Sequence, residues 1–239
     1  MPAAGPGDGL HPPQVERQRR DPNAIGGIAF RKRRSHLIMT LIEKASRETG
    51  RCWIADLGGE WWYWKIIDRG FLRRNRVSIH LINPGPVTPA EVDPELFTVL
   101  PCDACNLRHI PDRSFDLVHS NSVIEHVGDW SRIVAFAAEA RRLSSRYYVQ
   151  TPNFWFPLEP HFGMAPFIHW LPEPVRVQLM LRFRLGPIPT RTVSEAVAKS
   201  QSARLLSMPA FRSLFPDARI IRERVAGLTK SLIAVRDGR

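Results

Sequence analysis

The feature that most constrains the fold is a short apolar run that ends at a pair of glycines. Residues 52–55 are apolar, Asp56 follows them, and the chain turns at Gly58 and Gly59 before a segment with the pattern of a helix start. Glycines let the backbone approach a ligand closely, and the N–H groups at a helix N-terminus attract anions. The stretch therefore predicts a strand, a tight turn and a helix, with a nucleotide-like cofactor at the turn.

The rest of the chain alternates predicted strands and helices. An apolar stripe over 37–42 predicts a helix that ends near Gly50, and a second helix is predicted over 62–68. A third runs to residue 143 from a cap at Asp129 or Ser131. Strands are predicted at 76–82, 96–100, 115–120, 146–151, 218–225 and 229–235. This alternation predicts a doubly wound, Rossmann-like α/β fold with a parallel sheet, and the short turn at Gly227 makes the last two strands antiparallel.

The domain organisation follows from changes in composition. Residues 1–28 are rich in Pro, Gly and Arg and predict a disordered basic leader before one domain over 29–239. Within that domain, residues 153–190 combine prolines with aromatic side chains. Because they follow a sheet strand directly, they are predicted to form a lid over the carboxyl edge of the sheet. Residues 175–185 mix arginines with apolar side chains, so peripheral contact with a membrane surface stays open as an alternative.

Charge and cysteine content narrow the classes of partner. The chain carries 34 Lys and Arg against 23 Asp and Glu, a net charge of +11, but the arginines are spread and predict no specific nucleic-acid site. Cys52, Cys102 and Cys105 are too few for a disulfide framework, and nothing nearby completes a metal site around the last two, so no metal is predicted. A signal peptide and an apolar run of about 18 residues are both missing from the pattern, so a cytoplasmic protein is expected.

Polar side chains follow the first three predicted strands. Asp56 ends the first, Asn83 ends the second and Asp103 follows the third. An asparagine can bond ribose hydroxyls, and a carboxylate can accept from the exocyclic amine of adenine. Polar groups in these places strengthen the prediction of a nucleotide-type cofactor at the glycine turn.

The sequence resembles the class I S-adenosylmethionine-dependent methyltransferases, of the type 11-like branch with a DxGG turn. The matching stretches are IADLGG (54–59), CDA (102–104), IPDRSFDLV (110–118), SNSVIEHV (120–127), QTPN (150–153), EPHF (159–162) and GLTKS (227–231). The resemblance covers residue 35 onward and implies a seven-stranded, mostly parallel sheet with an antiparallel last strand. Two positions depart from the family pattern: Glu60 replaces a glycine of the fuller motif, and Asn83 stands where many relatives carry an acid.

The resemblance also implies a cofactor, S-adenosyl-L-methionine, and the residues that hold it. The implied cofactor-binding residues are Asp56, Gly58, Gly59, Asn83, Asp103, Ala104, Asn121 and Ser122. The first three face its methionine end and ribose side, Asp103 and Ala104 face the adenine, and the last two face the sulfonium and the substrate. The candidate catalytic bases are His126 and His161, since an imidazole titrates near neutral pH; a structural role is the alternative for each. His119, inside a strand, is predicted to be structural.

The predicted function is methyl transfer to an O or N nucleophile of a small-molecule acceptor, or of a carrier-linked or glycan-type one. The alternative is a catalytically weak relative that binds a partner or an anionic surface, which Glu60, Asn83 and the basic leader favour. An NAD-dependent enzyme is disfavoured because DLGGEW lacks the G-x-G-x-x-G spacing. The oligomeric state is left open.

Overall fold

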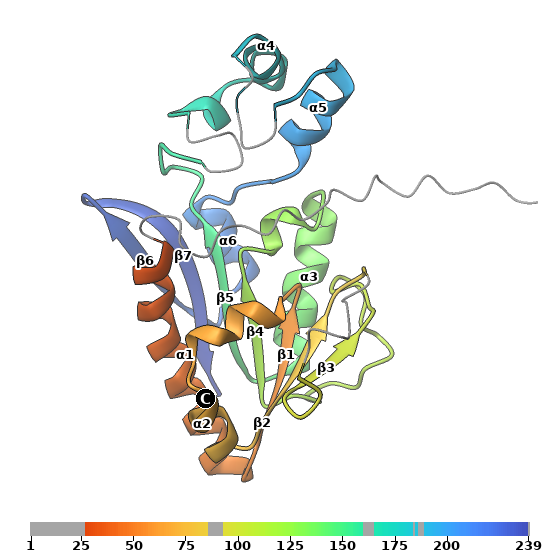
Figure 1. The fold of residues 1–239 in the computed structure, drawn as a ribbon, viewed down its shortest axis with the longest axis vertical. Coiled ribbons are helices and arrows are strands. Elements are labelled where there is room, and N and C mark those ends of the chain that lie inside the picture. Colours follow the sequence, from red (N-terminus) through yellow and green to blue (C-terminus); the bar gives the residue numbers. More distant parts are fainter. Residues whose placement is uncertain (1–26, 86–92, 160–164, 184, 186–188, 239) are drawn as a thin grey trace, which may run out of the picture.

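The computed structural model describes residues 27–85, 93–159, 165–183, 185 and 189–238. Its centre is one seven-stranded sheet in the order β3-β2-β1-β4-β5-β7-β6 (Figure 1). Strands β1 to β5 pair in parallel, and β7 is antiparallel to both β5 and β6. This topology confirms the predicted fold class, including the antiparallel last strand. The strands are β1 (Cys52–Leu57), β2 (Val77–Ile82), β3 (Phe97–Leu100), β4 (Leu117–Asn121), β5 (Arg146–Pro152), β6 (Arg219–Val225) and β7 (Leu228–Asp237).

Helices cover both faces of the sheet. On one face lie α1 (Gly27–Thr49), the 3-10 helix η1 (Trp61–Ile66) and α2 (Arg69–Arg74); on the other lie α3 (Trp130–Leu143) and α6 (Met208–Leu214) (Figure 1). Strand side chains alternate between the two cores, so that Leu117 packs with the α1 side while Val118 packs with the α3 side. A sheet buried on both faces explains the continuous apolar character of β1.

The main local difference from the predicted elements lies after the glycine turn. The helix predicted over 62–68 is instead η1 followed by a separate helix, α2. Asp68 separates them because it takes an extended backbone conformation and its side chain accepts a hydrogen bond from Phe71 N, which makes it the N-cap of α2. Of the two predicted caps of α3, Asp129 caps it through Arg132 N, and Ser131 lies inside the helix.

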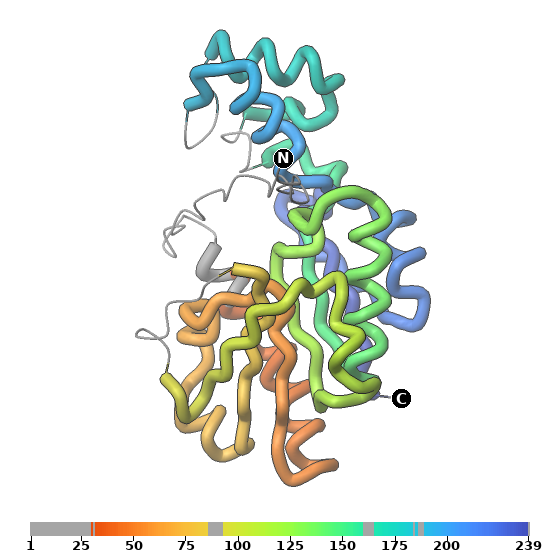
Figure 2. Tube along the Cα trace, turned by 90° about the vertical axis from the view of Figure 1, so that its right-hand side faces the viewer, coloured from red at the N-terminus to blue at the C-terminus, as the bar shows by residue number. Residues whose placement is uncertain are grey.

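The insertion after β5 forms a small helical unit beyond the carboxyl edge of the sheet (Figures 1 and 2). It contains the 3-10 helix η5 (Ile168–Trp170), α4 (Glu173–Phe183) and α5 (Val193–Gln201). A separate core of Ile168, Val177, Met180 and Ala196 joins these helices. Because α5 belongs to this core, the insertion continues past residue 190, and the chain rejoins the sheet where Leu206 pairs with Asn153.

Several predictions concern residues at the margin of the described structure. Residues 1–26 of the predicted leader and His161 lie outside the described residues, while α1 already begins at Gly27. Across the described ranges, the longest helices are too short or too polar to cross a membrane.

Candidate functional site

The glycine turn after β1 is closely packed from within the protein. A Cβ atom on Gly58, which has a φ of +69°, would collide with the side chain of Val123, and a Cβ on Gly59 would collide with the carboxylate of Asp56. Gly58 N also donates to Ile82 O of β2 at 2.8 Å. Glycine is therefore required at both positions, and the turn is held against the ends of β2 and β4.

Asp56 lies beneath this turn and faces inward. The residue is completely buried: Trp64 Nε1 donates to its Oδ2 at 2.7 Å, and His119 Nδ1 lies 2.6 Å from its Oδ1. The ring of Tyr148 stacks on His119 with a centroid distance of 5.4 Å. Asp56 thus ties η1 to β4, and His119 has the structural position that its place in a strand predicted.

Asn83 supports the turn from β2. It is buried, and its Nδ2 donates to Gly59 O at 2.5 Å. An asparagine can make this bond, whereas the carboxylate found at this position in many relatives lacks a donor. The amide at this position therefore suits the shortened turn of this chain.

Asp103 and Ala104 lie in the loop after β3. Arg132 Nη2 donates to both carboxylate oxygens of Asp103, at 3.0 and 2.9 Å, and Cys105 N donates to one of them at 3.0 Å. Partial burial raises the pKa of Asp103, but these hydrogen bonds outweigh it, so the pKa lies below its ordinary value. The Asp103 side chain is 39% exposed and Ala104 is buried. Arg132, which carries no motif signal, is thus an additional residue of this part of the site.

The tip of β4 meets a buried polar network. Arg34 Nη1 donates to Asn121 Oδ1 at 3.0 Å and to Gln150 Oε1 at 3.2 Å. Ser122, with a φ of +56°, donates from Oγ to the same Gln150 oxygen at 2.9 Å. Arg34 itself is paired with Glu223 of β6. Asn121 and Ser122 therefore lie together, as predicted, and three further residues surround them.

Arg34, the last residue of the basic run at 31–34, lies in the interior although charge at the start of an amphipathic helix is most often solvated. Its side chain is only 9% exposed. The apolar stripe of α1 contains Ile38, Leu41 and Ala45, and Arg34 lies one turn before Ile38 on the same face. Extending the stripe backward by four residues is the sequence signal that could have placed it in the interior.

His126 lies at the end of the 3-10 helix η3 (Ile124–His126). Its Nδ1 lies 2.7 Å from Ser202 O, and the residue is exposed. A backbone carbonyl only accepts, so Nδ1 carries the proton and, in the neutral ring, Nε2 is the basic nitrogen. His126 is therefore oriented by the chain that returns from the insertion.

The predicted cofactor residues share the carboxyl edge of the sheet. In strand order they run from Asp103 after β3, through Asn83 and the glycine turn, to Asn121 at β4. Neighbouring strands β1 and β4 mark the point where the strand order reverses, which is where open α/β sheets bind ligands. The fold thus brings together residues that lie up to 66 positions apart in the sequence, from Asp56 to Ser122.

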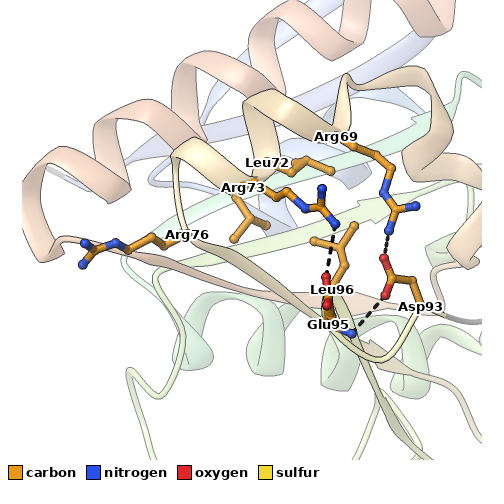
Figure 3. A pocket seen from close by; sticks show the side chains of 8 residues that line it. Arg69, Leu72, Arg73, Arg76, Asp93, Glu95 and Leu96 are labelled. Atoms are coloured by element: carbon orange, nitrogen blue, oxygen red, sulfur yellow. Dashed lines mark hydrogen bonds and ion pairs between the residues drawn. The ribbon is translucent and has the colours of Figure 1, made fainter.

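Two other features, a cysteine–histidine contact and a small pocket, do not form a second functional site. Cys102 Sγ lies 3.5 Å from His109 Nε2, but the described residues contain no group of three or more side chains that could hold a metal ion. A small pocket between α2 and the loop before β3 lies at the opposite, amino edge of the sheet (Figure 3). Two of its three arginines are paired with acids, Arg69 with Asp93 and Arg73 with Glu95.

Comparisons with known proteins show what this chain is similar to. Residues 83–145 match the family model of a methyltransferase domain, Methyltransf_11. This segment is similar in sequence to a methyltransferase domain, and the described residues have the seven-stranded Rossmann-like fold that the resemblance found in the sequence implies. The predicted cofactor, S-adenosylmethionine, is the one used by the class I methyltransferases.

Individual relatives match either a short part of the chain or most of it at low sequence identity. An uncharacterized protein of Mycobacterium tuberculosis is 33% identical over 70 residues, which are 29% of this chain and 23% of that protein. The chain thus spans less than a quarter of that relative. An S-adenosylmethionine-dependent methyltransferase from Archaeoglobus fulgidus has a TM-score of 0.50 at 11% identity, over 87% of this chain and 94% of that one. An N1-methyltransferase for 1,6-didemethyltoxoflavin from Burkholderia thailandensis has a TM-score of 0.46 at 12% identity, over 90% and 92%.

Proposed function

We propose that this chain transfers a methyl group from S-adenosylmethionine to an O or N nucleophile of a small-molecule acceptor, or of a carrier-linked or glycan-type one. The observation that carries the proposal is the row of polar groups and glycines at the β1/β4 switch point. The methyltransferase-domain match supports it because residues 83–145 include Asn83, Asp103 and Asn121.

The chemistry of the site fits the cofactor. The turn at Gly58 and Gly59 brings bare backbone to the sheet edge, where the methionine end and ribose side would be held, with Asp56 and Asn83 supporting the turn from below. Asp103 offers a half-exposed carboxylate to the exocyclic amine of adenine beside Ala104. Asn121 and Ser122 would lie on the sulfonium side. When bound, S-adenosylmethionine supplies a methyl group on a positively charged sulfur.

The chain's own contribution is mainly alignment and proton removal. An in-line displacement gains most of its rate from holding the reacting atoms in place with water excluded. The insertion between β5 and α6 stands beyond the carboxyl edge, where it would select the acceptor (Figure 1). In this proposal, Nε2 of His126 accepts the proton that the nucleophile loses, while its Nδ1 stays bonded to Ser202 O.

A calorimetric titration tests the cofactor assignment. The full chain is expected to bind both S-adenosylmethionine and S-adenosylhomocysteine. If the folded protein binds neither up to millimolar concentration, the proposal fails. A screen of acceptors with labelled methyl donor then identifies the substrate.

His126→Ala tests the proton acceptor once an acceptor is known. A positioned base contributes about 100-fold or more to the rate, so turnover should fall by that factor while cofactor affinity stays the same. The matched control is His109→Ala, which removes an imidazole outside the proposed site. Unchanged turnover in His126→Ala would exclude it as the base.

Binding to an anionic surface is a second candidate function, favoured by exposed aromatic side chains of the insertion. Trp155, Phe167 and Trp170 are exposed and lie together, with ring centroids 5.9 Å apart for the two tryptophans and 4.9 Å apart for Phe167 and Trp170. Aromatic rings beside basic residues are typical of membrane-surface contacts. Co-sedimentation with phosphatidylserine vesicles, but not with phosphatidylcholine vesicles, would support this function, and Trp155→Ala should weaken it.

A further inference from the structure

Two side-chain amides lie next to each other beyond the glycine turn, at the ends of β4 and β5. Asn121 and Gln150 are register partners in the parallel pair, and we refer to their side chains as the amide pair. Both carbonyl oxygens accept from the same atom, Arg34 Nη1, at 3.0 and 3.2 Å. Ser122 Oγ adds a second donor to the Gln150 oxygen.

These contacts fix which way each amide is turned. A guanidinium has donors and no acceptor, so both amides must present oxygen to Arg34. The –NH2 group of an amide lies on the other side of the same carbon, so both –NH2 groups are turned away from Arg34. Within the described ranges, neither –NH2 group has a hydrogen-bond partner, although Gln150 is only 1% exposed.

Arg34 is itself held rigidly. Its Nε donates to Glu223 Oε1 at 2.8 Å, and its Nη2 donates to the other oxygen of Glu223 and to Ser231 Oγ. Burial lowers the pKa of Arg34, but the bond and charge of Glu223 outweigh it, so the pKa is raised and the guanidinium stays charged. A two-point arginine–carboxylate pair allows little rotation, so the donor that the amide pair faces is fixed in place.

The two –NH2 groups are oriented donors, one on the buried Gln150 and one on the half-buried Asn121. An unbonded donor away from water costs about 1–3 kcal/mol, so a ligand oxygen that accepts from both groups is favoured. Asn121 ends β4 on the proposed sulfonium side of the cofactor, and Gln150 lies one strand further on, toward β7 and the insertion, whereas the glycine turn, Asn83 and Asp103 extend the other way.

We propose that the amide pair binds a carboxylate or carbonyl oxygen of the methyl acceptor, and that Arg34, held by Glu223, is the positioning residue that fixes its orientation. This inference rests on the proposed function and adds a substrate class to it. Acceptors with such an oxygen close to the methylated atom are bound, whereas a purely cationic amine offers the –NH2 groups no lone pair.

Side-chain NMR signals test the contact directly. The –NH2 signals of ¹⁵N-labelled protein saturated with S-adenosylhomocysteine are assigned by their loss in Asn121→Asp and Gln150→Glu. Sodium benzoate is expected to shift both signals, and benzylamine, which has the same ring without an oxygen, is expected to shift neither. No benzoate shift, or an equal shift with benzylamine, would overturn the proposal. It would also fail if S-adenosylhomocysteine alone shifted both signals and benzoate added nothing, since the pair would then belong to the cofactor carboxylate.

Affinity measurements separate this inference from the proposed function. Gln150→Glu still offers Arg34 an oxygen but replaces the –NH2 group, so benzoate affinity should fall about tenfold or more, the size of one lost bond to a charged group. S-adenosylhomocysteine affinity should stay unchanged. If Gln150→Glu leaves benzoate affinity unchanged, this inference is wrong and the proposed function is not affected. If the unaltered chain does not bind S-adenosylhomocysteine, the proposed function itself is wrong.

Arg34→Lys tests the positioning role. Lysine keeps a charge opposite Glu223 but lacks the planar fork, so the amides regain rotational freedom. The –NH2 signals of Asn121 and Gln150 should broaden, and benzoate affinity should fall while S-adenosylhomocysteine affinity is retained. Arg33→Lys, on the exposed side of the same helix, is the matched control. Sharp signals and unchanged benzoate affinity in Arg34→Lys would show that Arg34 does not position the pair.

Discussion

Asp56, near the end of β1, and Asp103, in the loop after β3, both lie at the carboxyl edge of the sheet, and the sequence assigned both to the cofactor. The structure gives them different surroundings. Asp56 is completely buried and bonded to Trp64 and His119, whereas the side chain of Asp103 is 39% exposed and paired with Arg132. A carboxylate at the end of a strand can therefore either be buried as a support for the turn or remain accessible to solvent, and only the accessible one is open to a ligand.

The largest expected effect is on stability, from Asp56→Ala. The substitution leaves the donors of Trp64 and His119 buried without an acceptor, so we expect a loss of about 3–5 kcal/mol in the free energy of unfolding. Urea denaturation measures it. Asp56→Asn, which keeps one acceptor, should lose less. A loss below about 1 kcal/mol would show that Asp56 is not the support of the turn.

Gly59→Ala should have the next largest effect. Its Cβ would overlap the Asp56 carboxylate, and forcing atoms into a packed region costs about 1–3 kcal/mol. Because the turn must shift, binding of S-adenosylmethionine in calorimetry should weaken too. The control is Gly85→Ala, where a Cβ meets open space and a change within about 0.5 kcal/mol is expected. Equal behaviour of the two variants would contradict the packing described for the turn.

Asp103→Ala should reduce cofactor affinity more than it reduces stability, the opposite of Asp56→Ala. An exposed ion pair contributes about 0–1 kcal/mol, so stability should change little, while affinity for S-adenosylmethionine should fall about tenfold, or 1.4 kcal/mol. Asp112→Ala is a matched control because Asp112, 73% exposed, is also paired with an arginine but lies outside the proposed site. Unchanged affinity in Asp103→Ala would mean that the adenine site is misplaced.

The smallest effect concerns the pH dependence of the same carboxylate. The pKa of Asp103 in the folded chain lies below the ordinary value of 3.8, so its contribution is fully present above that value and is lost as the pH falls through the lower folded value. The difference in unfolding free energy between the unaltered chain and Asp103→Asn should therefore be constant from about pH 8 to pH 5 and shrink below pH 3.8. A difference that shrinks already near neutral pH would contradict the lowered pKa.

Local patterns were enough to predict the sheet and its order of strands and helices. Apolar runs, glycine turns and the short connection at Gly227 act over a few residues, and each was found where the sequence placed it. The break between η1 and α2 was missed because it depends on how Asp68 bonds to Phe71, which the apolar pattern does not record. The extent of the insertion was missed because α5 is defined by its packing against α4.

Contacts between distant residues explain what the sequence could not predict of the site. Asn83 and Asp103 could be placed beside the glycines because strand ends in a parallel sheet meet at one edge, and Asn121 could be placed there from the family resemblance; that these residues bind the cofactor stays a prediction. Arg34 and Gln150 were not, since their roles depend on Glu223 and on each other. The apolar stripe of α1, extended backward by four residues, could have pointed to Arg34 within the basic run, but its partners Glu223 and Gln150 follow only from the tertiary structure.

The pairing of Arg34 with Glu223 has a consequence for when the site is completed. The two residues are 189 positions apart, so the contact belongs to the slowest class of loop closures during folding. A ribosome-bound chain that has not yet exposed residue 223 would already contain the glycine turn and Asp103, but its Arg34 would have no acid to hold it. The residues proposed to bind the cofactor are thus synthesised early and the acid that holds Arg34 late, so the chain would gain its proposed substrate selectivity only when β6 has joined the sheet.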